Sequence, residues 1–156
     1  MVTVQARLES LGITLPRPAA AAGNYLPIVE TDGWLYISGQ LPLSEGQLTC
    51  TGKVGAEVTV EEAYAAARLC AINALALIKE ALGGEEDALE HVRLVRVGGF
   101  VASAPGFTAQ PKAINGASDL LVEVLGDRGR HARAAVGVAE LPLGAAVEVE
   151  FVARRL

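Results

Sequence analysis

Aromatic residues and cysteines are scarce in this sequence. Phe, Trp and Tyr make up 4% of the 156 residues, whereas hydrophobic residues as a class make up 51%, so alanine and aliphatic side chains must fill the core. The two cysteines, Cys50 and Cys70, match neither a disulfide framework nor a metal-binding motif. Reduced thiols are typical of the cytoplasm, where we expect this protein to reside without a bound metal.

An excess of positive charge is also missing. Lys and Arg number 13 against 18 Asp and Glu, which gives a formal net charge of -5 at pH 7. Proteins that bind nucleic acid usually carry a basic surface, so the composition argues against such a partner. The N-terminus lacks a basic segment followed by an apolar run, and no stretch holds about 18 uncharged apolar residues. We therefore expect no signal peptide and no contact with a membrane.

The first clear structural signal is a hairpin. Asp32-Gly33 is typical of a type I′ turn, because both of its central residues need a positive φ. Apolar and β-branched residues on either side predict strands over 27–31 and 34–38. The second strand leads into Ser38-Gly39-Gln40, where Gly39 allows another backbone to approach closely. A polar, glycine-rich loop is expected to follow over 43–58.

Two longer helices are expected from apolar residues at helical spacing and from capping residues. Thr59 and Glu62 form a capping box that begins an alanine-rich helix, and Gly83-Gly84 ends it. Thr108 is expected to cap a second helix, which begins near Pro111 and ends before Gly126. The many alanines predict close packing of the first helix against a neighbour, such as a sheet.

Three further strands complete the pattern. One is expected over 91–103, broken or bulged at Gly98-Gly99. The Val- and Ala-rich segment 131–153 predicts two strands, joined into a hairpin by a tight turn at Leu141–Gly144. Each arm of this hairpin contributes a face with charged residues, since side chains alternate across a strand.

The faces of those two arms differ in character. Arg133 shares its face with Ala135, Gly137 and Ala139, so a long cation is expected beside a hollow left by small residues. Glu148 and Glu150 share a face of the second arm. If Leu141–Gly144 closes a hairpin, Arg133 and Glu148 lie about 13 Å apart along the ladder, at ~3.3 Å per residue. They would then cooperate more easily across a subunit boundary than within one chain.

The order of the main elements is β-β-α-β-α-β-β. It predicts an α+β fold in one domain over 1–156, with a mostly antiparallel sheet and two helices on one face. Residues 3–11 predict a short amphipathic helix, within an N-terminal extension over 1–15.

Four segments, in this order, resemble the YjgF-type Rid family of reactive intermediate deaminases. These segments are Gly23-Asn24-Tyr25, Ser38-Gly39-Gln40, Asn115, and Arg133 to Glu150 with its Val-x-Val, Leu-Pro and Val-Glu-Val-Glu elements. The likeness extends from about residue 20 to 153. The chain departs from the family pattern at Asn24, His131, Ala134 and Ala135, and its second helix lacks aromatics. It therefore resembles a divergent branch labelled endoribonuclease-like or chorismate-mutase-like.

The resemblance implies a chorismate-mutase-like fold and a homotrimer with a pocket at each subunit boundary. It implies that Arg133 grips a substrate carboxylate and that Glu148 positions a water, as the catalytic pair. It implies a substrate-binding role for four further residues: Tyr25, Ser38, Gly39 and Asn115. Each of the six also has a structural interpretation, such as an interface ion pair for Arg133 or a solvent-facing strand residue for Glu148.

The resulting hypothesis is a cofactor-free hydrolase that deaminates 2-imino and 2-enamino acids to 2-keto acids and ammonia. An Arg fork suits the carboxylate, and a carboxylate such as Glu148 suits proton exchange with a water. The alternative is a non-catalytic trimer that binds small carboxylates or keto acids. A chorismate mutase needs more cations than Arg133 supplies, and a ribonuclease needs a basic groove, so both are less well supported.

Overall fold

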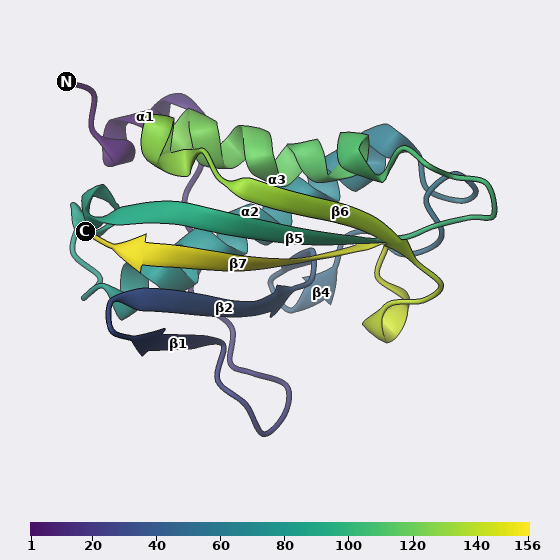
Figure 1. The fold of residues 1–156 in the computed structure, drawn as a ribbon, viewed down its shortest axis with the longest axis horizontal. Coiled ribbons are helices and arrows are strands. Elements are labelled where there is room, and N and C mark those ends of the chain that lie inside the picture. Colours follow the sequence, from purple (N-terminus) through teal and green to yellow (C-terminus); the bar gives the residue numbers. More distant parts are fainter.

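A five-stranded sheet with helices on one face forms the body of the protein (Figure 1). The computed structural model describes residues 1–156. The helices are α1 (Val4–Ser10), α2 (Val60–Ala81) and α3 (Gln110–Leu125). The strands are β1 (Ile28–Thr31), β2 (Trp34–Gln40), β3 (Leu43–Ser44), β4 (Gln47–Leu48), β5 (Val92–Ala102), β6 (Ala132–Val138) and β7 (Val147–Arg155). Three short 3-10 turns are η1 (Ala88–His91), η2 (Gly126–Gly129) and η3 (Pro142–Gly144).

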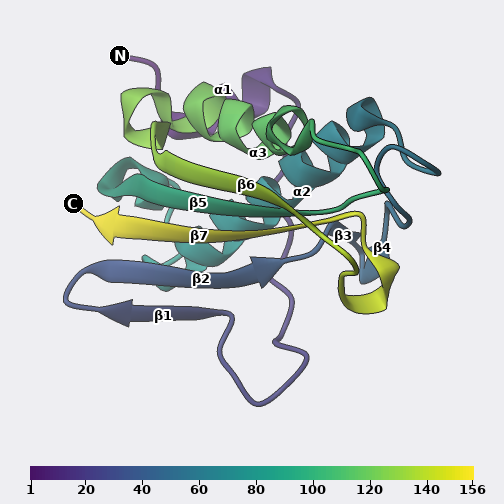
Figure 2. The same cartoon turned by 45° about the vertical axis from the view of Figure 1, so that its right-hand side comes forward.

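The predicted α+β class is confirmed, and the sheet is mostly antiparallel. Its strands lie in the order β1-β2-β7-β5-β6, and β5–β6 is its one parallel pair. Helices α2 and α3 cover one face of the sheet and leave the other uncovered, as Figure 2 shows from a second direction. No helix combines the length and the apolar character needed to cross a bilayer.

The first hairpin forms at the predicted turn. Asp32 and Gly33 have φ values of 50° and 79°, so both central residues occupy the left-handed region that a type I′ turn requires. Residues pair across the hairpin from Thr31 with Trp34 to Ile28 with Ile37. The segment 43–58, expected as a loop, in addition contains the two-residue strands β3 and β4.

Helix α2 begins at its predicted cap and buries its alanine-rich side. The Thr59 hydroxyl accepts a hydrogen bond of 3.1 Å from the backbone N–H of Glu62. Alanine side chains allow the helix to lie close against its neighbours, and α3 approaches it at Gly116. A Cβ at Gly116 would overlap the carbonyl oxygen of Tyr64 in α2. This close crossing fixes α3 relative to α2 and, through it, relative to the sheet.

Two local predictions were wrong. Thr108 does not cap α3, because the residue before the helix is Ala109 and it makes no capping bond. The β5 bulge lies between Leu94 and Arg96, where the register with β7 shifts. Gly98 and Gly99 stay in register, and they serve instead to let side chains approach the strand from its two faces.

The predicted C-terminal hairpin does not form. Strand β5 lies between β6 and β7, pairing in parallel with β6 and antiparallel with β7. At the end of β5, the Ser103 N–H donates to the Val138 carbonyl and the Ala102 N–H donates to the Ala146 carbonyl. The Leu-Pro-Leu-Gly segment makes a 3-10 turn within a wider connection. The hydrogen bonds that would have closed a hairpin are thus made to β5, a long-range pairing that local turn residues do not reveal.

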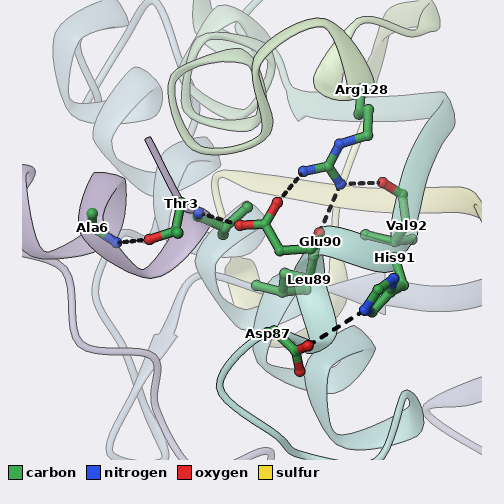
Figure 3. A network of polar contacts seen from close by, with 9 residues as sticks. Thr3, Ala6, Asp87, Leu89, Glu90, His91, Val92 and Arg128 are labelled. Atoms are coloured by element: carbon green, nitrogen blue, oxygen red, sulfur yellow. Dashed lines mark hydrogen bonds and ion pairs between the residues drawn. The ribbon is translucent and has the colours of Figure 1, made fainter. Parts of the chain in front are cut away.

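The N-terminal helix is tied to the body by a carboxylate. Figure 3 shows Glu90 of η1 accepting a 2.6 Å hydrogen bond from the backbone N–H of Val4 and a 2.9 Å bond from Arg128. Arg128 also donates to the carbonyls of Leu89 and Val92, each at 2.8 Å. Val4 and Leu8 of α1 belong to the main hydrophobic cluster. The predicted amphipathic helix is confirmed, and it packs beside α3 as part of the same core.

Candidate functional site

The six residues predicted for a site fall into two groups in one chain. Glu148 pairs with Phe100 on the uncovered face of the sheet, together with Glu150, whereas Val147, Val149 and Phe151 point toward the helices and are buried. Ser38 and Gly39 lie with Glu148 at the end of β2, and Tyr25 directly precedes Leu26, whose carbonyl binds the Ser38 hydroxyl. Arg133 and Asn115 form the second group, on the helix-covered face at the edge strand β6.

Gly39 leaves the space that the Glu148 carboxyl group occupies. The register between β2 and β7 shifts between Ile37 and Gln40, so Ser38 and Gly39 lie in a bulge. A Cβ at Gly39 would overlap Oε1 of Glu148 and lie 2.9 Å from its Cδ. The predicted close approach at Gly39 is thus to the Glu148 side chain, and any larger residue would displace that carboxylate.

Ser38 holds the segment that carries Tyr25. Its hydroxyl donates to the Leu26 carbonyl at 2.7 Å, and its backbone N–H donates to the Pro27 carbonyl at 2.9 Å. Tyr25 is 55% exposed and its hydroxyl makes no hydrogen bond within the chain. These bonds tie the segment directly after Tyr25 to the end of β2, and the Tyr25 side chain itself is exposed.

The environment of Glu148 favours its protonated form. Burial raises the pKa of its carboxyl group above the ordinary value, and the neighbouring Glu150 raises the pKa further. Arg96 interacts with Glu150, at 3.4 Å between Nη1 and Oε1, and no cation is paired with Glu148 itself. A carboxyl group with a raised pKa exchanges protons with a water or a leaving group at a pH closer to neutral.

Arg133 is held against α3 by three polar groups. Its Nη1 donates to Oδ1 of Asn115 at 2.8 Å and to Oγ of Ser118 at 3.1 Å. Its Nη2 makes a longer contact, 3.5 Å, with the carbonyl of Pro111. A guanidinium has five N–H donors, and Nε makes no hydrogen bond within the chain while Nη2 makes only this long contact. Nε and Nη2 are the two nitrogens whose shared edge can bind a carboxylate with two parallel hydrogen bonds.

Ser118 and His131 belong to this group, although neither was predicted as a site residue. Oγ of Ser118 lies 2.9 Å from Nε2 of His131, and Nδ1 of His131 lies 2.6 Å from the carbonyl oxygen of Gly129. The sequence spacing of these residues relative to Asn115 and Arg133 could have indicated them. Asn115 and Ser118 are three residues apart on a helix, so they share a face. His131 directly precedes β6 and lies two residues before Arg133, the spacing at which residues of an extended backbone point to the same side.

The two groups are distant from each other within the chain. Arg133 pairs with Val97 and Glu148 pairs with Phe100, on opposite sides of β5. Two strand spacings across the sheet and three residues along it separate their Cα atoms by about 14 Å, and their side chains leave the sheet on opposite faces. The separation resembles that expected from the hairpin, but its cause is the insertion of β5.

A separate hollow of about 630 Å³ lies between the 44–58 segment and α2. None of the six predicted residues lines it. Its thiol, Cys50, has a pKa raised by burial and by Glu62, so it is a poor nucleophile at neutral pH. The His, Cys, Asp and Glu side chains of the chain form no group of three or more that is placed to hold a metal ion.

Known proteins resemble this chain in sequence and in structure. The sequence profile of the family described as "YjgF/chorismate mutase-like, putative endoribonuclease" matches residues 5–154. Protein TCP17 of Trypanosoma cruzi is 49% identical over 148 residues, covering 94% of this chain and 91% of TCP17. The crystal structure of a protein from Shewanella oneidensis, titled a putative endoribonuclease, is 38% identical, with a TM-score of 0.91 over 97% of this chain and 99% of that one.

A more distant structure carries a more specific name. RidA from an Antarctic Psychrobacter is 26% identical, with a TM-score of 0.61 over 92% of this chain and 96% of that one. The family profile spans nearly the whole chain, and the Trypanosoma relative shares half of its residues. The family resemblance predicted from Tyr25, Ser38, Gly39, Arg133 and Glu148 is confirmed, and the chain belongs to the YjgF/chorismate-mutase-like family.

Proposed function

We propose that this protein is a cofactor-free deaminase that hydrolyses 2-imino and 2-enamino acids to 2-keto acids and ammonia. The observation that carries the proposal is the placement of Arg133. Asn115 and Ser118 fix its Nη1, and the Nε–Nη2 edge remains free for a carboxylate. Membership of a family that includes a RidA structure supports the same activity.

The chemistry requires one water and one proton relay. The Arg133 fork binds the carboxylate of the 2-imino acid and so places the imine carbon. A water held by Glu148 attacks that carbon and gives one proton to the Glu148 carboxylate, which passes it to the imine nitrogen, so that a neutral tetrahedral carbinolamine forms. Glu148 then takes the proton of the carbinolamine hydroxyl and passes it to the amino nitrogen as the C–N bond breaks, so that ammonia leaves and the 2-keto acid remains. The raised pKa of Glu148 suits both proton transfers.

This mechanism requires more than one copy of the chain. Arg133 and Glu148 leave the sheet on opposite faces, so one subunit would supply the Arg133 group and its neighbour the Glu148 group. The uncovered sheet face presents large apolar side chains, among them Val29, Trp34, Tyr36 and Val136, at 38–50% exposure. Apolar surface of this kind is typical of a protein interface. We propose a homotrimer with a site at each subunit boundary, and a monomer in light scattering would exclude it.

The activity test uses freshly generated 2-iminopropanoate and a set of bulkier 2-imino acids. The wild type is expected to accelerate their hydrolysis over buffer, and Arg133→Ala to lose that acceleration while keeping its fold and assembly. Arg130→Ala is the matched control, because Arg130 is exposed and pairs only with Asp127 at 3.2 Å. Equal rates for the wild type and Arg133→Ala would exclude this role for Arg133.

A binding module remains the second candidate, and the departures from the family pattern favour it. Ala134 and Ala135 replace a Ser and a Cys expected next to the arginine, and the second helix has no aromatic residue. A trimer that binds small carboxylates without turnover would gain thermal stability from 2-oxobutanoate yet leave the imino acids unchanged. Ribonuclease activity is disfavoured by the net charge of -5, because proteins that bind nucleic-acid phosphates usually carry an excess of basic residues.

We also propose that the protein resides in the cytoplasm. Cys50 and Cys70 are both free thiols, and thiols stay reduced in that compartment.

A further inference from the structure

We infer that His131 and Ser118 are positioning residues that hold the Arg133 guanidinium in its carboxylate-binding orientation, with His131 as the neutral tautomer protonated on Nδ1. The inference rests on the proposed function for the role of Arg133, and it assigns the residues that prepare that arginine for its ligand. Neither residue contacts the proposed substrate; both act through Arg133.

The contacts form a continuous chain of hydrogen bonds. The Gly129 carbonyl lies 2.6 Å from Nδ1 of His131, Nε2 of His131 lies 2.9 Å from the Ser118 hydroxyl, and that hydroxyl lies 3.1 Å from Nη1 of Arg133. Arg133 only donates and the Gly129 carbonyl only accepts. These two ends fix the direction of every bond between them.

The direction of the chain determines the protonation state of His131. Because the carbonyl of Gly129 can only accept, Nδ1 must carry the proton, and in a neutral ring Nε2 is then an acceptor. The Ser118 hydroxyl donates its proton to Nε2 and keeps its lone pairs for Arg133. With a proton on Nε2, the Ser118 hydroxyl would accept hydrogen bonds from both His131 and Arg133, and its own proton would no longer have Nε2 as an acceptor.

Gly129, where the chain of hydrogen bonds starts, is held in place by close packing. A Cβ at Gly129 would overlap the carbonyl oxygen of Leu121 in α3, so only glycine allows η2 to lie against that helix. The carbonyl of Gly129 therefore keeps a fixed position relative to α3, the helix that also carries Asn115 and Ser118. The groups that bind His131 and Arg133 thus all have fixed positions on or against α3, which is the arrangement that orients a functional side chain.

The charges around His131 support its neutral form. It is half-buried, and burial lowers the pKa of its imidazole, as does the nearby Arg133 cation, while the Gly129 carbonyl opposes the shift. No carboxylate pairs with His131 to stabilise its charged form. Asp127 pairs with Arg130, and Asp119 and Glu123 of α3 bind Tyr64 and Arg68 of α2.

The first arm of the test is spectroscopic and needs no substrate. The 15N spectrum of the imidazole rings at pH 7.5 is expected to show one ring protonated on Nδ1, which disappears in His131→Gln, while the exposed His91 serves as the internal reference. Ser118→Ala is expected to change the signal of the first ring only. A ring of His131 protonated on Nε2 would overturn the inference.

The second arm separates positioning from structural support. Ser118→Ala is expected to raise KM for 2-iminopropanoate about tenfold with kcat within about twofold, since one hydrogen bond to a charged group is lost. Ser118→Thr keeps the hydroxyl and is expected to restore KM, and His131→Gln, which keeps an acceptor, to perform better than His131→Ala. An unchanged KM in Ser118→Ala, in an enzyme that depends on Arg133, overturns the inference.

The two arms distinguish the inference from the proposed function. If the wild type and Arg133→Ala turn over substrate equally, the proposed role of Arg133 fails, and the imidazole spectrum alone decides whether His131 is the Nδ1-protonated neutral ring that orders Arg133. If turnover depends on Arg133 and the spectrum is as expected, KM in Ser118→Ala decides whether that order matters for binding.

Discussion

Arg133 and Glu148 lie on opposite sides of β5 and point to opposite faces of the same sheet, with Arg133 paired to Val97 and Glu148 to Phe100. Each has its own supporting group: Asn115 and Ser118 for the arginine, and Gly39 for the glutamate. The chain thus presents two separate groups, and the proposed chemistry, which uses both residues, would require surfaces from two copies.

Gly39→Ala is expected to reduce deaminase activity by about tenfold or more, because its Cβ would occupy the position of the Glu148 carboxylate. The end of the Glu148 side chain can rotate away, so the fold should survive. The matched control is Gly98→Ala, whose Cβ would lie 2.9 Å from Oε1 of Glu150 instead. Steady-state rates of both variants check this, and a larger loss in Gly98→Ala would contradict it.

Glu148→Gln is expected to abolish turnover and to stabilise the protein at neutral pH. The raised pKa of Glu148 means that the folded chain binds more protons than the unfolded chain at a pH just above the ordinary carboxyl value. Stability therefore falls as the pH rises through that window, and the charged form is a cost at pH 7. Removing the charge should raise Tm by about 1–3 °C for a domain of this size. Thermal melts at pH 4 and pH 7 check the sign, since the gain should vanish at the lower pH.

The protein is expected to lose stability as the pH falls below about 6.5, the ordinary value for histidine. The pKa of His131 is lowered in the folded chain, chiefly by burial. Between the folded and unfolded values the unfolded chain binds more protons, so acidification favours unfolding. The comparison of wild type with His131→Gln in melts from pH 5 to 8 isolates this contribution. Equal pH dependence in the two proteins would assign it to other groups.

Arg128→Ala is expected to destabilise the protein by about 2–3 kcal/mol, as loss of a half-buried hydrogen-bond network typically does. Arg128 joins Glu90 to the carbonyls of Leu89 and Val92, and Glu90 in turn binds the N-terminus of α1 (Figure 3). Hydrogen exchange should show α1 opening before the sheet. Arg130→Ala, at an exposed ion pair, is the control and should change stability little.

Local signals in the sequence predicted what local interactions determine. The Asp32-Gly33 turn and the Thr59 cap follow from residues within a few positions of each other, and both are present as predicted. The alternation of Glu148 and Glu150 with buried Val and Phe residues also held, because it depends only on strand periodicity.

The pairing of strands that are distant in the sequence could not be predicted from these local signals. The segments on either side of Leu141–Gly144 have the residue types of a hairpin, but both strands form their backbone hydrogen bonds with β5 instead. No residue between 131 and 153 indicates that β5 lies between them. The six candidate residues came from the family resemblance, and the fold brings Arg133 to Asn115 and Glu148 to Gly39. His131 and Ser118 were not predicted, because their hydrogen bonds join residues next to β6 to α3. These contacts, and the bond from His131 to the Gly129 carbonyl, depend on tertiary packing that the sequence does not reveal.

The measurement that tests the central claim most directly is complementation between inactive subunits. Arg133→Ala and Glu148→Gln proteins, each inactive alone, are unfolded, mixed in equal amounts and refolded, and mixed oligomers are verified by native mass spectrometry. If each site takes Arg133 from one chain and Glu148 from another, random assortment restores about a quarter of the wild-type activity. No recovery, in a sample shown to contain mixed oligomers, would contradict a site shared between chains.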